Sequence, residues 1–382
     1  GTMRLPSATG VTSHIQLDGG TINVLAGLQL GEYGDKGAGT MEIGPDGTLV
    51  IAGNAVSQIE GYIVEGILTA SVGSINIIEN DGNTIVTAEI IPKAHYPNPS
   101  DGGEVGDLDG LSPVLSWTAG DYAATHDVFF SDNWDDVNDG TALVSDGSAE
   151  PNYGPVTLEK TFDKTYYWRV DEVNSTDGNS PWIGDIWSFD VGYTTGAGDH
   201  YLNVDNMEYN DVEVDAAWIE SGGAYSIEIG EAHWGTSSMS LSYSGNSTVT
   251  RTFDAFDLTE PGFNLKSLTI WFNGDMSNDG GELTVTLSDS DGDSSAAVAY
   301  AGDASDYNDG QWHEWNILLE DFNNTNMDLN KFNEVAITVG SGYGDYLIDD
   351  IRLYASRCLL ESAPVGDVTG DCRVDIEDFA QL

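Results

Sequence analysis

The segment Tyr346-Leu347-Ile348-Asp349-Asp350-Ile351 closes a series of short apolar runs that begins near residue 200. Turn-forming Gly, Asn and Asp separate these runs, a pattern typical of strands joined by tight turns. The runs cover residues 202–207, 238–243, 249–253, 267–272, 283–287, 313–318, 334–339 and 346–354. About eight strands of this kind predict a jelly roll over residues 200–357.

The composition of the whole chain favours the same fold class. The 382 residues include 46 Gly and 11 Pro, and Thr, Ser, Val and Ile dominate the apolar stretches. Long runs of Ala, Leu, Lys and Glu, which would favour helices, are missing. Hydrophobic residues make up 40% of the chain, which is enough to form cores. We therefore expect an all-β protein made of tandem domains.

The charge is strongly one-sided. The chain has 12 Lys+Arg against 64 Asp+Glu, a formal net charge of -52. Nucleic acids and anionic membrane surfaces need a cationic face, so both are excluded as ordinary partners. Cations and neutral sugars fit such a surface. No apolar stretch approaches the roughly 18 residues of a membrane-spanning helix, so we expect no membrane insertion.

Residues 1–92 contain a spaced repeat. Gly-Thr pairs occur at Gly1-Thr2, Gly20-Thr21 and Gly39-Thr40, 19 residues apart each time, and again at Gly47-Thr48. Short strands at a fixed period predict a β-solenoid, here truncated at its start, with a helix or turn over 58–70 and last strands at 74–78 and 84–91. A small irregular β-sandwich is the alternative. A solenoid that starts within a coil has an open strand edge, which upstream coils or another copy of the chain would cover.

Residues 93–110, rich in Pro, Gly and Asp, are predicted to be a linker. The strands expected over 111–193 place Trp117 early and Tyr166 late in that segment. In these features the segment resembles a fibronectin type III domain, which implies a role in spacing or protein contact. Trp168, Trp182 and Trp187 are expected in its core or interface. A second linker is predicted at 194–199.

The jelly-roll segment 200–357 contains three further cues, which are Val204-Asp205-Asn206-Met207-Glu208, Trp312-His313-Glu314-Trp315 and the closing run at Tyr346. With these it resembles the galactose-binding-type jelly rolls of many carbohydrate-binding modules. The resemblance implies a calcium ion shared by acids on the first and last strands, for which Glu208 and Asp350 are the candidates. Capping or surface carboxylates are the alternative. The series of domains resembles large secreted proteins of aquatic bacteria.

Sugar binding needs exposed aromatic planes beside polar groups, because the CH groups of a sugar pack on a ring face. The aromatic residues considered are Trp218, Tyr225, Trp234, Trp271 and Trp312. Trp234 and Trp312 are our candidate platforms, while each ring taken singly is more often buried. Trp271 alternates ambiguously with Leu268 and Ile270, so it is also a core candidate.

Residues 367–378 form a twelve-residue calcium-loop pattern. Oxygen ligands fall at positions 1, 3, 5, 9 and 12, with a backbone carbonyl at position 7; these residues are Asp367, Thr369, Asp371, Asp375, Asp378 and, for the carbonyl, Arg373. The segment 358–382 resembles one half of a type I dockerin, which implies calcium and a cohesin-type partner. It departs from that family because Cys372 replaces the glycine at position 6 and the second repeat is missing. The run 289–293, although acidic, is interpreted as a hairpin turn.

Two further features concern export. Cys358 and Cys372 are predicted to form a disulfide in an oxidising compartment, and two free thiols are the alternative. Glycosylation sequons lie at Asn174, Asn246 and Asn323. We therefore expect an extracellular or cell-surface protein.

The six histidines are scattered, and no nucleophile elbow, metalloprotease helix or phosphate-binding loop occurs in the sequence. We therefore predict no enzymatic activity. The first hypothesis is a structural scaffold of the cell surface or matrix, which assembles head to tail into fibrils through its open β edge. The second is a carbohydrate-binding accessory region of a larger secreted enzyme or adhesin, with a polysaccharide as partner. A hydrolase, with paired carboxylates among the many acids, is the third.

Overall fold

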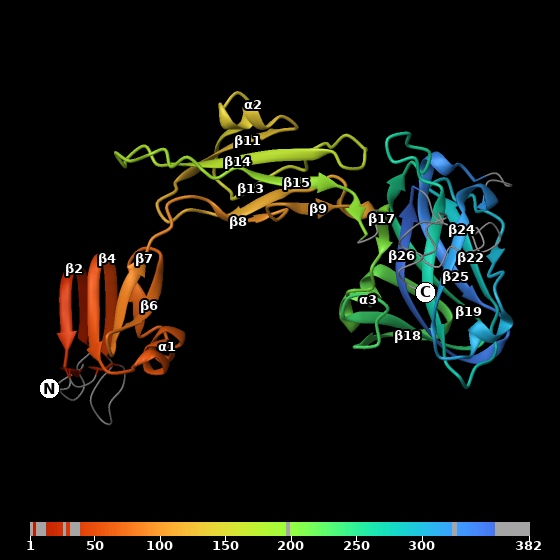
Figure 1. The fold of residues 1–382 in the computed structure, drawn as a ribbon, viewed down its shortest axis with the longest axis horizontal. Coiled ribbons are helices and arrows are strands. Elements are labelled where there is room, and N and C mark those ends of the chain that lie inside the picture. The colour runs from red at the N-terminus through yellow and green to blue at the C-terminus, as the bar shows by residue number, and fades with distance from the viewer. Residues whose placement is uncertain are drawn as a thin grey trace, which may run out of the picture. The chain divides into compact units, whose positions relative to one another are not determined.

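The computed structural model describes residues 3–4, 13–25, 28–30, 39–195, 199–322 and 327–355. Strands dominate throughout, which confirms the all-β prediction (Figure 1). Contacts divide the chain into two compact units. One contains 1–98, 116–153 and 167–187, and the other contains 99–115, 154–166 and 188–382.

The elements have the following bounds. The first strands are β1 (Met3–Arg4), β2 (Ser13–Val24), β3 (Leu28–Gln29), β4 (Gly39–Ala52), β5 (Leu68–Ala70), β6 (Ser74–Asn80), β7 (Asn83–Glu89), β8 (His95–Asn98), β9 (Gly103–Val105), β10 (Leu115–Thr118), β11 (Thr125–Ser131), β12 (Leu143–Ser148) and β13 (Asn152–Tyr153). They are followed by β14 (Thr165–Val173), β15 (Trp187–Val191), β16 (Tyr193–Thr194), β17 (His200–Asp205), β18 (Trp218–Ile229), β19 (Ser237–Phe256), β20 (Ser267–Gly274), β21 (Asp279–Gly280), β22 (Leu283–Asp289), β23 (Val298–Ala299), β24 (Trp312–Leu318), β25 (Phe332–Val339) and β26 (Gly342–Tyr354). The helices are α1 (Val56–Val64), α2 (Trp134–Asn138) and α3 (Asp211–Ala217), with 3-10 turns η1 (Leu108–Gly110), η2 (Ala304–Tyr307), η3 (Leu319–Phe322) and η4 (Leu329–Lys331). Among the described residues, no helix has the length and apolar character needed to cross a membrane.

The first sheet has the strand order β2-β4-β7-β6. β2 pairs with β4 in parallel, and its Thr21 lies opposite Thr48, whereas β4 and β7 are antiparallel. The Gly-Thr pair at 20–21 is therefore in register with the pair at 47–48, and not with the pair 19 residues away that the repeat suggested. Strand pairing follows backbone register and not the spacing of similar dipeptides. The solenoid stays a prediction.

The interior of this sheet comes from alternating strand residues. Ile43, Leu49 and Val86 have no exposed surface, and neither has Ile59 of α1. The segment predicted as a helix or turn thus forms α1 and the strand β5. A register shift between Leu17 and Gly19 marks a bulge where the chain of β2 approaches β4 closely.

The predicted linker 93–110 contains two strands. β8 pairs with β10, where Ser116 lies opposite Asn98, and β9 pairs with β15 in parallel. Short extended segments of this kind tolerate the Pro and Gly content that suggested a linker, since β8 lies at the edge of its sheet. The six-segment division of the chain stays a prediction.

The tryptophans of the 111–193 segment largely follow the expectation. Trp168 and Trp187 are buried and their rings lie 4.7 Å apart, centroid to centroid. Trp117 is also buried, whereas Trp182 is half-buried and stacks on Tyr122. The fibronectin-like assignment stays a prediction.

Residues 200–355 form the largest sheet system. The long strand β19 pairs on one side with β18 along most of its length, and on the other side with β26 in its first half and with β25 in its second half. The first half thereby belongs to the series β18-β19-β26-β20-β24, and the second half to β18-β19-β25-β22-β23. Apart from the short β23, these strands contribute fully or nearly fully buried apolar residues, among them Met239, Leu241, Val249, Ile270, Phe272, Val285, Leu287, Val335, Ile337 and Ile348.

The strand pattern differs from the expected one at two places. Residues 238–243 and 249–253, expected as two strands, are both parts of β19. β18, which follows α3 directly, was not predicted. Its run Ser221-Gly222-Gly223-Ala224 lacks the bulky residues that indicate a strand.

A matched pair of glycine substitutions tests the close approach of β2 to β4 in the first sheet. A Cβ at Gly47 would overlap the carbonyl oxygen of Leu17, whereas a Cβ at exposed Gly61 of α1 meets nothing within 4 Å. We expect Gly47→Ala to destabilise the first sheet by about 1–3 kcal/mol. Gly61→Ala should stabilise it by about 0.5–1 kcal/mol, because glycine is unfavourable in a helix interior. Hydrogen–deuterium exchange of the β4 amides measures both effects, and equal protection in the two variants would contradict the close approach.

Candidate functional site

A bulge in β26 turns two consecutive carboxylates to the same side of the sheet. Opposite β20, Thr269 pairs with Arg352 and Trp271 with Asp349, so β26 has one extra residue in this interval. Asp350 occupies the bulge with a φ of +47°. Asp349 and Asp350 are both buried, and both contact His233 from a neighbouring loop.

The loop 230–236 between β18 and β19 is held at its centre by these two acids. Oδ2 of Asp349 accepts hydrogen bonds from the backbone N–H groups of His233, at 2.9 Å, and Trp234, at 3.3 Å. Oδ2 of Asp350 lies 2.7 Å from Nδ1 of His233. The other oxygen of Asp350 accepts from the guanidinium of Arg352. The loop therefore has a fixed position above the sheet.

Glu208 holds the far end of the same loop. Its Oε1 accepts a hydrogen bond from the backbone N–H of Thr236 at 2.6 Å, and Oε2 accepts from the Thr236 hydroxyl at 2.5 Å. Gly235 has a φ of +79°, and a Cβ there would overlap the Glu208 carboxylate. Only glycine suits both requirements at this position.

The fixed loop brings an aromatic group together. The His233 ring stacks on Trp271 of β20, with centroids 3.6 Å apart and planes inclined by 12°. Trp312 of β24 lies edge-on to His233 at 5.9 Å. Trp271 and Trp312 are half-buried, and the neighbouring Trp234 is 71% exposed. Ring surface is thus available to a ligand at this face.

A groove of about 370 Å³ lies on the same face. Asn273, which lines it, pairs with Trp312 on β24 and with Leu347 on β26. Because directly opposed residues share one face of a sheet, the groove adjoins the aromatic group. The lining residues are Glu228, Glu231, Ser240, Asn273, Asp275, Met276, Gly310, Asp345, Tyr346 and Leu347.

The groove is polar and acidic. Four of its lining residues carry carboxylates, and no lysine or arginine is among them. The hydroxyl of Ser277 donates to Oδ1 of Asp275 at 2.5 Å and, with the backbone N–H of the same residue, lowers the pKa of that carboxyl. The amide nitrogen of Asn273 donates to the carbonyl oxygen of Gly310 at 3.3 Å. The arrangement offers hydrogen-bond acceptors and ring faces side by side.

In the structure, the five aromatic residues that were considered as sugar platforms fall into two groups. Trp271 and Trp312 come together at the face through their contacts with the His233 ring, and the exposed Trp234 follows His233 in the loop. Trp218 is buried and donates from Nε1 to Asp205 at 3.0 Å, and the half-buried Tyr225 donates its hydroxyl hydrogen to the carbonyl of Trp218 at 2.8 Å. Sequence reasoning missed His233, although it directly precedes the candidate Trp234.

Glu208 and Asp350 contact the same loop at different residues. That the two carboxylates share a calcium ion stays a prediction. Within the described residues, the group of three or more His, Cys, Asp or Glu side chains close enough together that they could hold a metal ion is a different one, formed by Asp306, Asp309 and His313. The predicted calcium loop, Asp367, Thr369, Asp371, Arg373, Asp375 and Asp378, lies outside the described residues, as do Cys358, Cys372 and Asn323.

Two sequons and the acidic run are described. Nδ2 of half-buried Asn174, the atom that would carry a glycan, donates to the carbonyl of Tyr122 at 2.8 Å, whereas Asn246 is exposed. Their glycosylation stays a prediction. The run 289–293 forms the expected turn, since Oδ1 of Asp289 accepts from the backbone N–H groups of Asp291 and Asp293, both at 3.0 Å.

Comparison with known proteins gives likenesses to solved structures. No family model matches the chain, and no curated protein matches it. The family 11 carbohydrate-binding module of a Clostridium thermocellum cellulosomal cellulase is 12% identical, with 40% of this chain and 93% of that chain covered and a TM-score of 0.30. The CBM22-1 xylan-binding domain of Paenibacillus barcinonensis Xyn10C is 12% identical, with coverage of 39% and 90% and a TM-score of 0.27.

An enzyme chain also matches. A beta-1,2-glucanase of Parabacteroides distasonis is 18% identical, with 42% of this chain and 26% of that chain covered and a TM-score of 0.31. TM-scores this low do not establish a function, so the functional proposal rests on the site itself.

The buried Asp349 gives the fold a specific pH dependence. Burial, and then the charge of Asp350, raise the pKa of Asp349 from 3.8 to about 7. Between these values the folded chain binds more protons at this site than the unfolded chain, so the contribution of Asp349 to stability falls as the pH rises from about 4 to 7. Asp349→Asn does not titrate. We expect its unfolding free energy to fall less over this range than that of the wild type, by on the order of 1–4 kcal/mol.

Urea denaturation of both proteins at pH 4.5 and 7.5 measures this difference. The comparison of the two pH slopes cancels the titration of the acids that do not interact with Asp349. Parallel slopes would show that the carboxyl of Asp349 is not perturbed in the folded protein.

Proposed function

We propose that the chain binds a polysaccharide through the face formed by Trp234, His233, Trp271 and Trp312 and the adjoining groove. The observation that carries this proposal is the fixed aromatic group beside a 370 Å³ groove lined by polar side chains. This is the second of our sequence-based hypotheses, and it has more support in the structure than the self-assembling scaffold.

The chemistry of the face suits a sugar. The CH groups on one side of a pyranose pack against a ring face, and its hydroxyls need hydrogen-bond partners at the edge. Asn273, Ser240 and the groove carboxylates offer such partners. The stack on His233 fixes the plane of Trp271, so little side-chain entropy is lost when a ligand binds.

We further propose that the face serves as a non-catalytic accessory region of a larger secreted protein. The net charge of -52 suits a neutral or cationic partner. The calcium loop at 367–378 and its cohesin-type partner belong to the same proposal and rest on the sequence pattern alone.

Affinity electrophoresis against a panel of neutral polysaccharides, including mixed-linkage β-glucan and xylan, tests the proposal. We expect Trp312→Ala and Trp271→Ala each to weaken retention at least tenfold, because each removes a ring from the face. Trp234→Ala should weaken it less, since this side chain makes fewer contacts in the free protein.

Trp134→Ala is the matched control. Trp134 is 47% exposed on α2, outside the proposed face, so its loss should leave retention unchanged. Failure of the wild-type chain to bind any polysaccharide in the panel, or equal loss in the control, would reject the proposed function.

The scaffold hypothesis keeps one supporting observation. β2 is an end strand of its sheet among the described residues, with β4 on one side. A twelve-residue end strand is a template for another chain. Sedimentation velocity at neutral pH with calcium tests it: end-to-end assembly predicts larger species as the concentration rises, and a constant monomer over a hundredfold range would reject it.

A further inference from the structure

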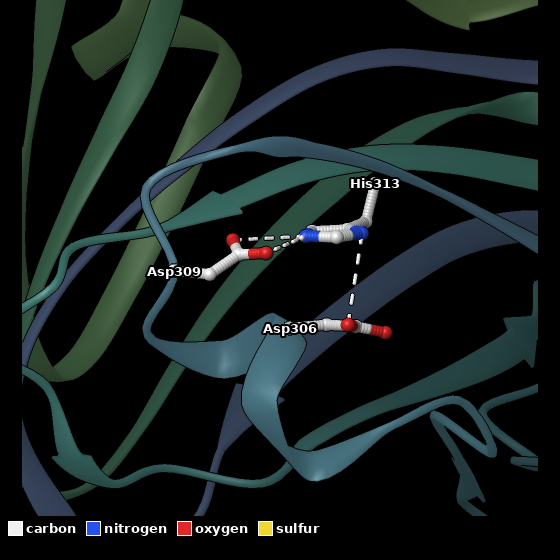
Figure 2. A group of neighbouring side chains, drawn as sticks. All are labelled: Asp306, Asp309 and His313. Carbon is white, nitrogen blue, oxygen red and sulfur yellow. Dashed lines mark hydrogen bonds and ion pairs between the residues drawn. The ribbon is translucent and has the colours of Figure 1, made fainter.

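A separate cluster lies on the segment that leads into β24. Asp306 comes from η2, Asp309 from the turn that follows and His313 from the second residue of β24 (Figure 2). One ligand atom from each side chain lies within 4.8 Å of the others. The polysaccharide face does not use any of these three side chains.

The two ring nitrogens of His313 face different carboxylates. Nε2 lies 3.0 and 3.1 Å from the two oxygens of Asp309, as Figure 2 shows. With the ring proton placed on Nε2, Nδ1 carries a lone pair that faces Oδ1 of Asp306 at 3.9 Å. That distance is too long for a hydrogen bond. An ion bound to both atoms at about 2.0–2.2 Å needs them slightly closer, which a small rotation of the Asp306 side chain provides.

Groups outside the cluster fix its members. The Tyr300 hydroxyl donates to Oδ2 of Asp306 at 2.6 Å and leaves Oδ1 directed at His313. The backbone N–H of Gln311 donates to Oδ1 of Asp309 at 2.9 Å. The ring of His313 lies against Phe272, with centroids 5.6 Å apart. The donor atoms are therefore positioned before any ligand arrives.

The local charge is unbalanced. Two carboxylates share one imidazole, and within the described part of the chain neither forms an ion pair with lysine or arginine. The side chains of Asp306 and His313 are only 17% and 21% exposed, so water screens the pair incompletely. A bound cation supplies the missing positive charge.

We propose that Asp306 and His313 bind one divalent transition-metal ion of the zinc class, with Asp309 holding the imidazole in the required tautomer. Imidazole nitrogen combined with carboxylate oxygen suits zinc and its neighbours, whereas calcium prefers oxygen alone. A carboxylate that accepts the second ring N–H of a metal-binding histidine is the usual supporting arrangement. Water completes the coordination.

The site lies beside the groove. Gly310, between Asp309 and Gln311, lines the groove, and its backbone N–H donates to the carbonyl of Gly274 at 3.0 Å. A metal ion at His313 would restrain the segment that forms this wall. The metal proposal stands whether or not the groove binds sugar.

Isothermal titration of the full chain with Zn²⁺, in buffer with excess Ca²⁺ to fill oxygen-only sites, tests the proposal. We expect one saturable site in the wild type. His313→Gln and Asp306→Asn should weaken it at least 100-fold, and Asp309→Asn should weaken it by about 10–100-fold. His200→Gln is the matched control. His200 lies 3.3 Å from one carboxylate, that of Asp163, so its loss should leave the affinity for Zn²⁺ unchanged.

Two further measurements keep the test decisive if a variant fails to fold. Co²⁺ bound to the wild type should give visible absorption bands of mixed nitrogen and oxygen ligation. Zn²⁺ should protect His313 from diethylpyrocarbonate, as mapped by mass spectrometry. Absence of a saturable site, unchanged Zn²⁺ affinity in folded His313→Gln, or modification of His313 unaffected by Zn²⁺ would each overturn the proposal.

Discussion

The aromatic face on residues 200–355 depends on one constraint, the extra residue in β26 that turns Asp349 and Asp350 to the same side. A regular strand alternates its side chains, so only one of two consecutive acids would reach the loop. With the bulge, Asp349 accepts from the loop backbone and Asp350 from the His233 ring. The stack of His233 on Trp271, and with it the aromatic group, follows from this anchoring.

The anchoring has an electrostatic cost that the surroundings offset. Two adjacent carboxylates are buried, and burial with mutual repulsion raises the pKa of Asp349. Three backbone N–H groups donate to Asp349, while Arg352 and His233 face Asp350. Arg352 in turn lies over the ring of Tyr201 at 4.5 Å. Ionised acids are expensive to bury, and these donors offset part of that cost while they hold the loop in place.

The many acidic side chains have different roles at different places in the fold. In the groove, carboxylates without basic neighbours offer acceptors to hydroxyl groups and disfavour anionic ligands. At Glu208 and Asp289 the same chemical group caps backbone N–H groups of a loop and a turn. At Asp306 and Asp309 two acids converge on one histidine. Charge counted along the sequence does not distinguish these roles, since each depends on what faces the carboxylate.

The sequence by itself determined the fold class and most strands of residues 200–355, because apolar alternation and turn residues are local properties. It also singled out Trp234 and Trp312 as candidate platforms, because sugar binding needs aromatic rings beside polar groups. It did not predict β18, whose small residues carry no strand signal, or the pairing of Thr21 with Thr48. Only the tertiary structure decided that Asp349 and Asp350 share one side, that His233 stacks on Trp271, and that Asp306, Asp309 and His313 meet. Those arrangements depend on a bulge and on contacts between segments far apart in the chain, which local pattern does not encode.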